Sequence, residues 1–259
     1  MIDIIPFCTE TDLLELRLRE LDPIVDRWIV IQSRETHSGK PKPLIFDPQD
    51  ARWAPWASRM ETFIVPPITT QDPWRREQAT RHIIPHLLST VPDDVPVILS
   101  DVDEIPSAAL LSAWAPELTY DRWVGFSMAT FYYYLNLKGR RRSPGIALAT
   151  SRTVCRWGGQ HLRSQRLRTV PVGPIEGGWH FSWQGGTEAI QLKLTSFAHT
   201  EYDIPELTDV GHLLSCLQQH TPLFERGSTR FTPCPLSELP LDIQARPAAY
   251  AHLLLPEGP

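Results

Sequence analysis

The feature of this sequence that most constrains its fold is the alternation of short apolar runs with segments of helical periodicity. Trp28–Ile31 is apolar throughout and rich in β-branched residues, a pattern typical of a strand buried on both faces of a parallel sheet. Ile4–Cys8 and Val95–Leu99 have a similar character. Between the first two runs, leucines recur at helical spacing and predict a helix over residues 11–21.

The same alternation continues along the chain. A helix is predicted over residues 74–88, with Asp72 as its cap, Pro73 in its first turn and a kink at Pro85. Further strands are predicted at Phe63–Val65, Trp123–Leu135, Ile146–Thr150 and Gly177–Trp183, and further helices at Ser107–Trp114 and Thr187–Phe197. Strands and helices at these short intervals predict an α/β fold with a mostly parallel central sheet flanked by helices.

Toward the end of the chain, proline becomes frequent and periodicity fades. We therefore expect a main domain over residues 1–227 and a proline-rich C-terminal tail over residues 228–259 that packs on it. The length of 259 residues is sufficient for a substantial buried core.

Charge and composition exclude several classes of protein. The formal net charge of -5 argues against a nucleic-acid partner, which usually binds a basic stripe. The four cysteines are widely scattered and predict free thiols rather than a zinc site or a disulfide framework. No run is long and apolar enough to span a bilayer, and Met1–Pro6 lacks the pattern of a signal peptide. We therefore expect a cytoplasmic protein. Its oligomeric state is not predicted.

An acidic cluster follows directly after the predicted strand Val95–Leu99. Asp101, Asp103 and Glu104 place three carboxylates within four residues, where they repel one another unless a cation neutralises them. Ligands of open α/β sheets bind at the carboxyl ends of the strands, and Mg²⁺ or Mn²⁺ would bring phosphate oxygens to such a site. The alternative interpretation is a solvated turn that caps the helix beginning near Ser107.

The segment Leu99–Pro106, with the sequence LSDVDEIP, closely resembles the signature of glycosyltransferase family 17. Other stretches resemble the same family in the same order: Leu13–Leu18, Glu20–Pro23, Thr36–Leu44, Trp74–Glu77, Phe131–Asn136, Gly178–Ser182, Gly185–Gly186, and Lys193 with Ser196, Phe197 and His199. The resemblance runs from about Phe7 to Phe224. Thr9–Asp12 departs from the family's Asn-Glu-Leu-Asp, and Trp183-Gln184 departs from its pair of aromatic residues.

This resemblance implies a Rossmann-like, nucleotide-sugar-binding fold of the GT-A type. It also implies an inverting transfer of a sugar, GlcNAc in the best known members, from a UDP-sugar to a glycan or other hydroxyl acceptor, with Mn²⁺ or Mg²⁺ as cofactor. Asp101 and Asp103 then bind the metal and the donor. Asp103 is expected to contact the metal directly, and Asp101 the ribose or a metal-bound water. Glu104 either supports this pair or caps a helix.

Inverting transfer needs a base that deprotonates the acceptor hydroxyl. We predict Glu188 for this role, because it lies near the start of a helix that follows two glycines. The alternative is an acidic residue that only complements the helix dipole. His199 is a candidate third metal ligand, since imidazole suits Mn²⁺, and His180 could contact the donor phosphates, the metal or the acceptor. A structural role is the alternative for both histidines.

Arg75 and Arg81 are candidate donor-binding residues, because a guanidinium matches phosphate oxygens. The alternative for Arg81 is an ion pair with Glu77 on an exposed helix face. Lys193 could neutralise phosphate or extend over the surface. Trp179, Trp183 and Tyr133 are candidate acceptor contacts through sugar stacking, with core packing as the alternative.

Two other functions fit the same pattern. Clustered carboxylates also serve metal-dependent nucleotidyltransferases and phosphatases, although the first strand is followed by no glycine-rich phosphate loop. A non-catalytic protein that binds carbohydrate or nucleotide-sugar is the second alternative.

Overall fold

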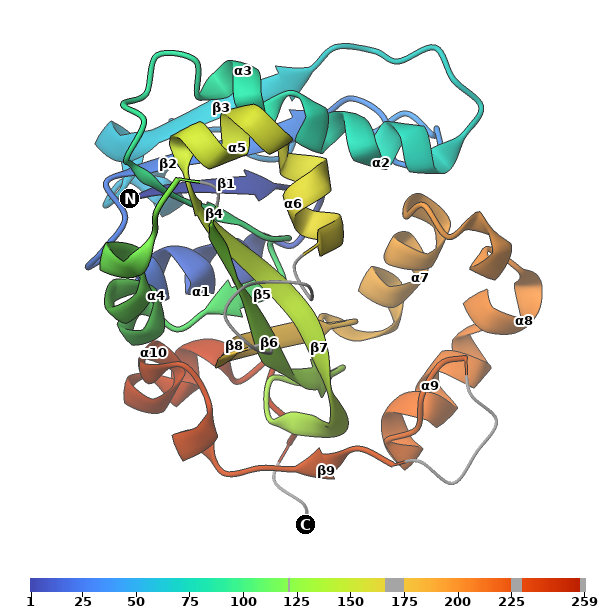
Figure 1. Ribbon diagram of the computed structural model, residues 1–259. Coiled ribbons are helices and arrows are strands. Elements are labelled where there is room, and N and C mark those ends of the chain that lie inside the picture. Colours follow the sequence, from blue (N-terminus) through green and yellow to red (C-terminus); the bar gives the residue numbers. More distant parts are fainter. Residues whose placement is uncertain (121, 166–174, 225–229, 257–259) are drawn as a thin grey trace.

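The computed structural model describes residues 1–259 except 121, 166–174, 225–229 and 257–259 (Figure 1). The described residues form a nine-stranded sheet in the order β3-β2-β1-β4-β7-β6-β8-β5, with β9 paired to β7. The strands span β1 (Ile2–Pro6), β2 (Arg27–Ser33), β3 (Met60–Val65), β4 (Pro96–Leu99), β5 (Glu104–Pro106), β6 (Trp123–Tyr132), β7 (Leu137–Thr150), β8 (Ile175–Ser182) and β9 (Thr232–Pro233).

The first half of the sheet is parallel. β1 pairs in parallel with β2 on one side and with β4 on the other, and β3 continues the run beyond β2. The chain leaves β1 toward β2 and returns to the opposite side of β1 with β4, so the direction of winding reverses between β1 and β4. The second half is mixed, since β7 is antiparallel to both β4 and β6 while β6 and β8 are parallel. The predicted α/β class, with a largely parallel central sheet flanked by helices, is confirmed.

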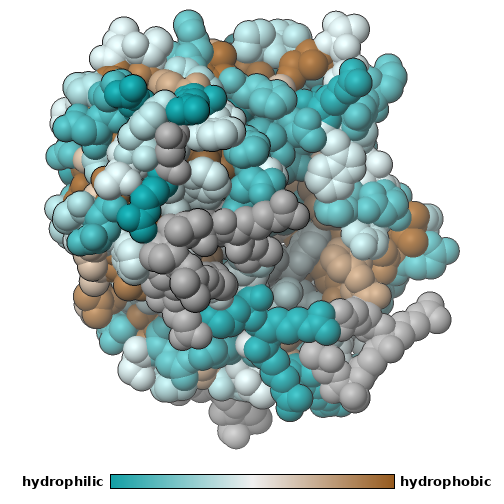
Figure 2. All heavy atoms as spheres, viewed as in Figure 1, coloured by the Kyte–Doolittle hydropathy of each residue, from teal (hydrophilic) through white to brown (hydrophobic). Residues whose placement is uncertain are grey.

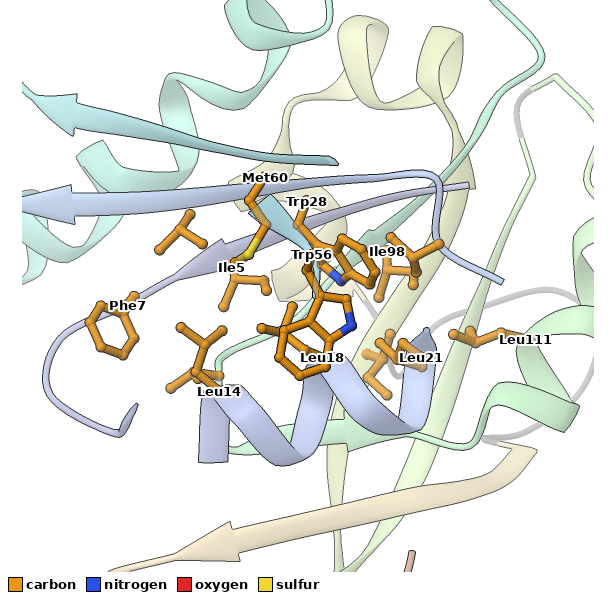
Figure 3. Packing of buried hydrophobic residues seen from close by; sticks show 14 of the residues in the cluster. Ile5, Phe7, Leu14, Leu18, Leu21, Trp28, Trp56, Met60, Ile98 and Leu111 are labelled. Carbon is orange, nitrogen blue, oxygen red and sulfur yellow. The ribbon is translucent and has the colours of Figure 1, made fainter. Parts of the chain in front are cut away.

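Two apolar clusters cover the two faces of the parallel half of the sheet. On one face, α1 (Thr11–Leu21) and α4 (Ala108–Trp114) pack against alternate strand residues, and Figure 3 shows Leu14, Leu18 and Leu21 directed toward Ile5 and Trp28. On the other face lie α2 (Pro73–His82), α3 (Ile84–Leu87), α5 (Ser151–Trp157) and α6 (Gly159–Gln165). Burial on both faces explains why these strands are continuously apolar in sequence.

Local signals predicted the helix boundaries well. The helix predicted over 11–21 has those bounds. The helix predicted over 74–88 is divided into α2 and α3, because Pro85 has no N–H to donate to the carbonyl of Arg81. The side chain of Asp72 accepts from the backbone N–H of Trp74 at 2.9 Å, as predicted for the cap. The strand predicted at 146–150 is longer than expected, since β7 begins at Leu137.

The remaining helices lie beyond β8. These are α7 (Gly186–Ser196), α8 (Pro205–Thr208), α9 (Val210–Gln219) and α10 (Leu241–Ala245). Short 3₁₀ helices span Ala51–Trp53, Ala57–Arg59, Ala115–Glu117, Thr200–Tyr202, Leu236–Glu238 and Pro247–Tyr250. Within the described residues, no helix is long and apolar enough to cross a membrane.

Residues of the C-terminal segment enter the core. Leu239, Ile243 and Tyr250 are buried in a cluster that includes Leu16 of α1 and Phe181 of β8. In the same region β9 pairs with β7. The predicted boundary at residue 227 lies outside the described residues.

Candidate functional site

A cavity of about 610 Å³ lies at the carboxyl ends of β1, β2 and β4. Its walls include Phe7–Glu10 after β1, Glu35–His37 after β2 and Asp101–Glu104 after β4, with Ser196–His199 at the end of α7 closing the far side. Figure 2 shows this face of the molecule hollowed to the right of its centre. The reversal of winding between β1 and β4 opens the sheet here, which is where open α/β sheets bind ligands.

Asp101 is held between two guanidinium groups. Arg81 of α2 donates to Oδ1 at 2.6 Å, and Arg163 of α6 donates to Oδ2. Arg81 is itself buried and also donates to Glu77 at 2.8 Å. The ion pair between Arg81 and Glu77 that was the alternative interpretation therefore forms, but it faces the cavity rather than solvent. Both carboxylate oxygens of Asp101 are engaged by protein cations.

Asp103 faces the cavity with one oxygen engaged. The Lys193 ammonium donates to Oδ2 at 2.7 Å, and His180 Nε2 lies 3.8 Å from the same oxygen. The other ring nitrogen of His180 is 2.9 Å from the hydroxyl of Ser143, which fixes the orientation of the ring. Lys193 does not extend over the surface. It crosses the cavity wall from α7 to reach a carboxylate 90 residues earlier in the sequence.

Glu104 fastens the loop that carries the two aspartates. Its carboxylate accepts from the backbone N–H of Asp101 at 3.0 Å and from Arg163 at 3.2 Å. Beneath the loop, the fully buried Arg17 donates to the carbonyls of Asp101 and Glu104 at 2.9 and 2.8 Å. Glu104 therefore supports the aspartates; the helix-cap alternative is wrong, because the first N–H of α4 is bonded by Glu20.

Burial and ion pairing act in opposite directions on these carboxyls. Burial alone would raise the pKa of Asp101, but Arg163 and Arg81 outweigh it and hold the pKa below its usual range. The pKa of Asp103 is lowered in the same way, with Lys193 outweighing burial. For Glu104 burial dominates and raises the pKa. The two aspartates are therefore ionised at neutral pH.

The structure divides the predicted site residues into two groups. Asp101, Asp103, Arg81, His180, His199 and Trp183 line the cavity. Arg75, Glu188, Trp179 and Tyr133 are not among the described residues that line it.

Each residue of the second group has a physical reason for its position. The side chain of Arg75 is 75% exposed and pairs with Asp72. Glu188 is exposed on the first turn of α7. Tyr133 is buried and donates to the carbonyl of Thr221 at 2.6 Å, so the core-packing alternative holds for it. The indole of Trp179 donates to the carbonyl of Glu238, which ties it to the C-terminal segment.

His199 lines the cavity without joining the aspartates. Its Nδ1 is 2.7 Å from Glu201, and its ring packs edge-on against Trp74. Among the described residues, no group of three His, Cys, Asp or Glu side chains is placed to hold a metal ion. The predicted trio of Asp101, Asp103 and His199 is therefore not assembled in this arrangement.

Sequence reasoning assigned no role in the site to two cations, Arg163 and Arg17, and to one carboxylate, Glu10. Arg163 belonged to no motif, and the segment that forms α5 and α6 was not predicted as helical. Arg17 lies in the family-like stretch Leu13–Leu18, but no role was predicted for it. Lys193 was considered, but its contact with Asp103 depends on the fold. Glu10 lines the cavity, and its carboxylate lies 3.8 Å from the Lys193 ammonium. Its sequence signals were its place in the loop after the first strand and its match to the glutamate of the family's Asn-Glu-Leu-Asp within Thr9–Asp12.

Known proteins resemble this chain over the region that forms the cavity. The sequence profile of glycosyltransferase family 17 matches residues 1–209. The chain belongs to glycosyltransferase family 17. The matched region contains every described wall of the cavity except Phe224.

Curated relatives agree with this assignment. The beta-1,4-mannosyl-glycoprotein 4-beta-N-acetylglucosaminyltransferase of Rattus norvegicus is 24% identical over 249 residues, covering 81% of this chain and 45% of the relative. The Homo sapiens protein of the same name is 28% identical over 232 residues, covering 74% and 42%. This family 17 chain thus spans less than half the length of these relatives. A crystal structure of galactosyltransferase LgtC with donor and acceptor sugar analogs aligns with 78% of this chain and 80% of its own, at 11% identity and a TM-score of 0.33.

Proposed function

We propose that this chain transfers a sugar, GlcNAc, from a UDP-sugar to a hydroxyl of a glycan, with inversion at the anomeric carbon, and that its fold is of the GT-A type. The observation that carries the proposal is the ionised Asp103, paired with Lys193 at the cavity between β1 and β4. This is where a nucleotide bound at the ends of parallel strands presents its phosphates. Membership of glycosyltransferase family 17 supports the reaction class.

Protein cations around the cavity suit a diphosphate. Arg81, Arg163 and Lys193 all reach the loop after β4, from three different helices. Arg81 and Arg163 are committed to Asp101, which fixes that carboxylate as part of the scaffold of the site. Lys193 contacts one oxygen of Asp103 and lines the open cavity, so it can also stabilise negative charge on the departing diphosphate.

A divalent cation can be held at this site only if the donor supplies further ligands. Asp101 has both oxygens engaged, whereas Asp103 Oδ1 has no hydrogen bond to the described residues. Mg²⁺ and related ions are commonly held by one or two carboxylates together with substrate phosphates. Asp103 would thus hold Mn²⁺ or Mg²⁺, which supplies Lewis-acid charge neutralisation when bound. His199, bonded to Glu201, is not retained as a ligand.

The names of the relatives support the acceptor class. They act on a β-1,4-mannosyl-glycoprotein, so we propose a mannose-containing glycan as the acceptor. Trp183 lines the cavity beside Lys193, whose ammonium lies 5.6 Å from the indole ring, and it is the aromatic residue retained for sugar contact.

The test is calorimetric titration of UDP-GlcNAc in the presence of Mn²⁺ and of EDTA. We expect binding that weakens in EDTA, and weak binding of Mn²⁺ alone, because the donor completes the metal site. Asp103→Asn should reduce the metal-dependent affinity at least about tenfold. Asp93→Asn, whose side chain is 72% exposed, is the matched control and should bind as the parent does.

Absence of UDP-GlcNAc binding in folded protein would contradict the proposal, as would unchanged affinity in Asp103→Asn. Release of UDP from UDP-GlcNAc by the parent protein would exclude the non-catalytic alternative. Turnover of a nucleoside triphosphate instead would favour the nucleotidyltransferase alternative.

A further inference from the structure

A second cavity, of about 240 Å³, adjoins the first where α1 and α7 begin. It is lined by Asp12 and Leu13 of α1, by Gln184 and Ala189 at the start of α7, and by Phe181 of β8. Thr9, Glu10 and Lys193 line both cavities, so they form the wall between them. Lys193 Nζ lies 2.7 Å from Asp103 and 3.8 Å from Glu10, so the ammonium lies close to both carboxylates.

Gln184 lines this cavity, and one of its side-chain atoms has no hydrogen-bond partner among the described residues. Gln184 Oε1 is buried with no hydrogen bond to the described residues, while its Nε2 donates to the carbonyl of Ser182 at 3.2 Å. A buried acceptor without a donor costs about 1–3 kcal/mol, so such atoms usually mark the position of a water or a ligand. The amide geometry leaves Oε1 as an acceptor, and the group that satisfies it must be a donor.

Glu10 presents a second acceptor. Its Oε2 accepts from the backbone N–H of Thr9 at 2.9 Å, which orients the carboxylate. Its Oε1 lies 3.8 Å from Lys193 Nζ, beyond hydrogen-bonding distance. Oε1 is therefore available to a donor in either cavity. Two acceptors in a small recess with apolar walls from Phe181, Leu13 and Leu253 suit a neutral, hydroxyl-bearing ring.

We propose that the smaller cavity binds one pyranose ring of the acceptor and that Glu10 is the base that deprotonates its reacting hydroxyl. This inference rests on the proposed function. The volume of 240 Å³ is below the roughly 300–1,000 Å³ of pockets for drug-sized ligands, so it matches a single ring rather than an oligosaccharide. The remainder of a glycan extends into solvent.

In the reaction, the Glu10 carboxylate accepts the proton of the acceptor hydroxyl. The hydroxyl oxygen forms a bond to the anomeric carbon of the donor sugar, whose bond to the diphosphate oxygen breaks. The electron pair of that bond leaves with the nucleoside diphosphate, on which Lys193 can stabilise the charge. Glu10 replaces Glu188 as the candidate base, because Glu188 is exposed and lines neither cavity among the described residues.

Binding of the acceptor ring is tested with methyl β-D-mannopyranoside, followed by saturation-transfer NMR in the presence of UDP. We expect binding by the parent protein. Ala189→Leu fills the smaller cavity without touching the larger one, and should abolish this signal while UDP titrates normally. Gln184→Leu should weaken the glycoside about tenfold. Gln218→Leu, at an exposed position on α9, is the matched control and should bind as the parent does.

The role of Glu10 is tested by UDP release from UDP-GlcNAc with the same glycoside as acceptor. Glu10→Gln should lower the transfer rate at least about 100-fold, the usual contribution of a general base, while UDP and glycoside bind within twofold of the parent. Glu188→Gln is measured in parallel as the rival. A rate loss confined to Glu188→Gln, or no loss in Glu10→Gln, overturns the assignment of the base.

The outcomes separate this inference from the proposed function. If the parent binds UDP but not the glycoside, the inference fails and the proposed function stands. The same conclusion follows if Ala189→Leu binds the glycoside as well as the parent does. A glycoside that binds without transfer also overturns the inference, because a ring bound as proposed must react. If the parent does not bind UDP, the proposed function itself fails. Thermal melting of each variant identifies loss of fold.

Discussion

Individual charged residues of the site are balanced by partners from distant parts of the chain. Three carboxylates after β4 would repel one another without neighbouring cations. Arg81, Arg163 and Lys193 form ion pairs with them and reduce this repulsion. The consequence is that the aspartates are not equivalent. Two guanidinium groups engage Asp101, whereas Asp103 keeps one oxygen toward the cavity. A D-x-D pattern alone could not distinguish these roles.

Cys8 offers a pH-dependent test of the cavity. It lines the wall after β1, and burial raises the pKa of its thiol to about 11. The thiolate is the reactive form, and at pH 8 only about one Cys8 thiol in a thousand is ionised at any moment. We expect alkylation of Cys8 by iodoacetamide to rise about tenfold per pH unit from pH 8 to pH 10, as measured by peptide mass spectrometry.

A labelling rate that levels off below pH 9 would contradict this assignment of the Cys8 pKa. Addition of UDP at fixed pH should slow the labelling further, because a nucleotide in the cavity would shield the thiol.

At the scale of elements, a buried ion pair joins α1 to β1, and its arginine also bonds the loop after β4. Arg17 of α1 donates to both oxygens of Asp3 in β1, and both side chains are completely buried. Arg17→Met leaves the Asp3 carboxylate buried without its partner and should lower the free energy of unfolding by about 3–5 kcal/mol. Urea denaturation measures this change.

The double variant Asp3→Asn with Arg17→Met supplies the control. It removes both charges, so it should be less destabilised than Arg17→Met alone. Equal stability of the single variant and the parent protein would show that the pair is unimportant. Because Arg17 also holds two carbonyls of the acidic loop, weaker UDP binding should accompany the loss of stability in both variants.

Sequence patterns predicted the features of helices and strands that depend on residues close together in the chain. The apolar runs identified the parallel strands, and Asp72, Pro73 and Pro85 determined the start and the break of the helical segment. Contacts between distant segments were not predictable. Arg163 meets Asp101 across 62 residues of sequence, and no periodicity indicated it.

The sequence pattern also could not predict which face of a helix lines the site. Ala189 and Lys193 are four residues apart and share the face of α7 that lines the smaller cavity. Glu188 precedes Ala189 by one residue, a rotation of about 100° around the helix axis, and therefore faces solvent. The sequence correctly indicated a helix at this place, but it did not indicate which of the charged residues of that helix would line a cavity.

For the molecule as a whole, the question is whether the C-terminal segment belongs to the same cooperative unit as the sheet. The family profile ends at residue 209, yet Ile243 of α10 is completely buried in a cluster with Leu16 of α1 and Phe181 of β8. The backbone N–H of Leu135, after β6, also donates to the carbonyl of Leu253 at 2.9 Å. The segment is therefore expected to unfold together with the domain.

The pair Ile243 and Leu241 tests this expectation within a single helix. Ile243→Ala removes a fully buried side chain and should lower the free energy of unfolding by about 2–5 kcal/mol. Leu241→Ala, at a position that is 73% exposed, should change it by no more than about 0.5 kcal/mol. Urea denaturation should show one transition in both variants, displaced only in Ile243→Ala. If the main transition stayed in place and a separate one appeared at low urea, the C-terminal segment would be an independent appendage, and the smaller cavity, which Leu253 helps to line, would lose one wall without loss of the domain.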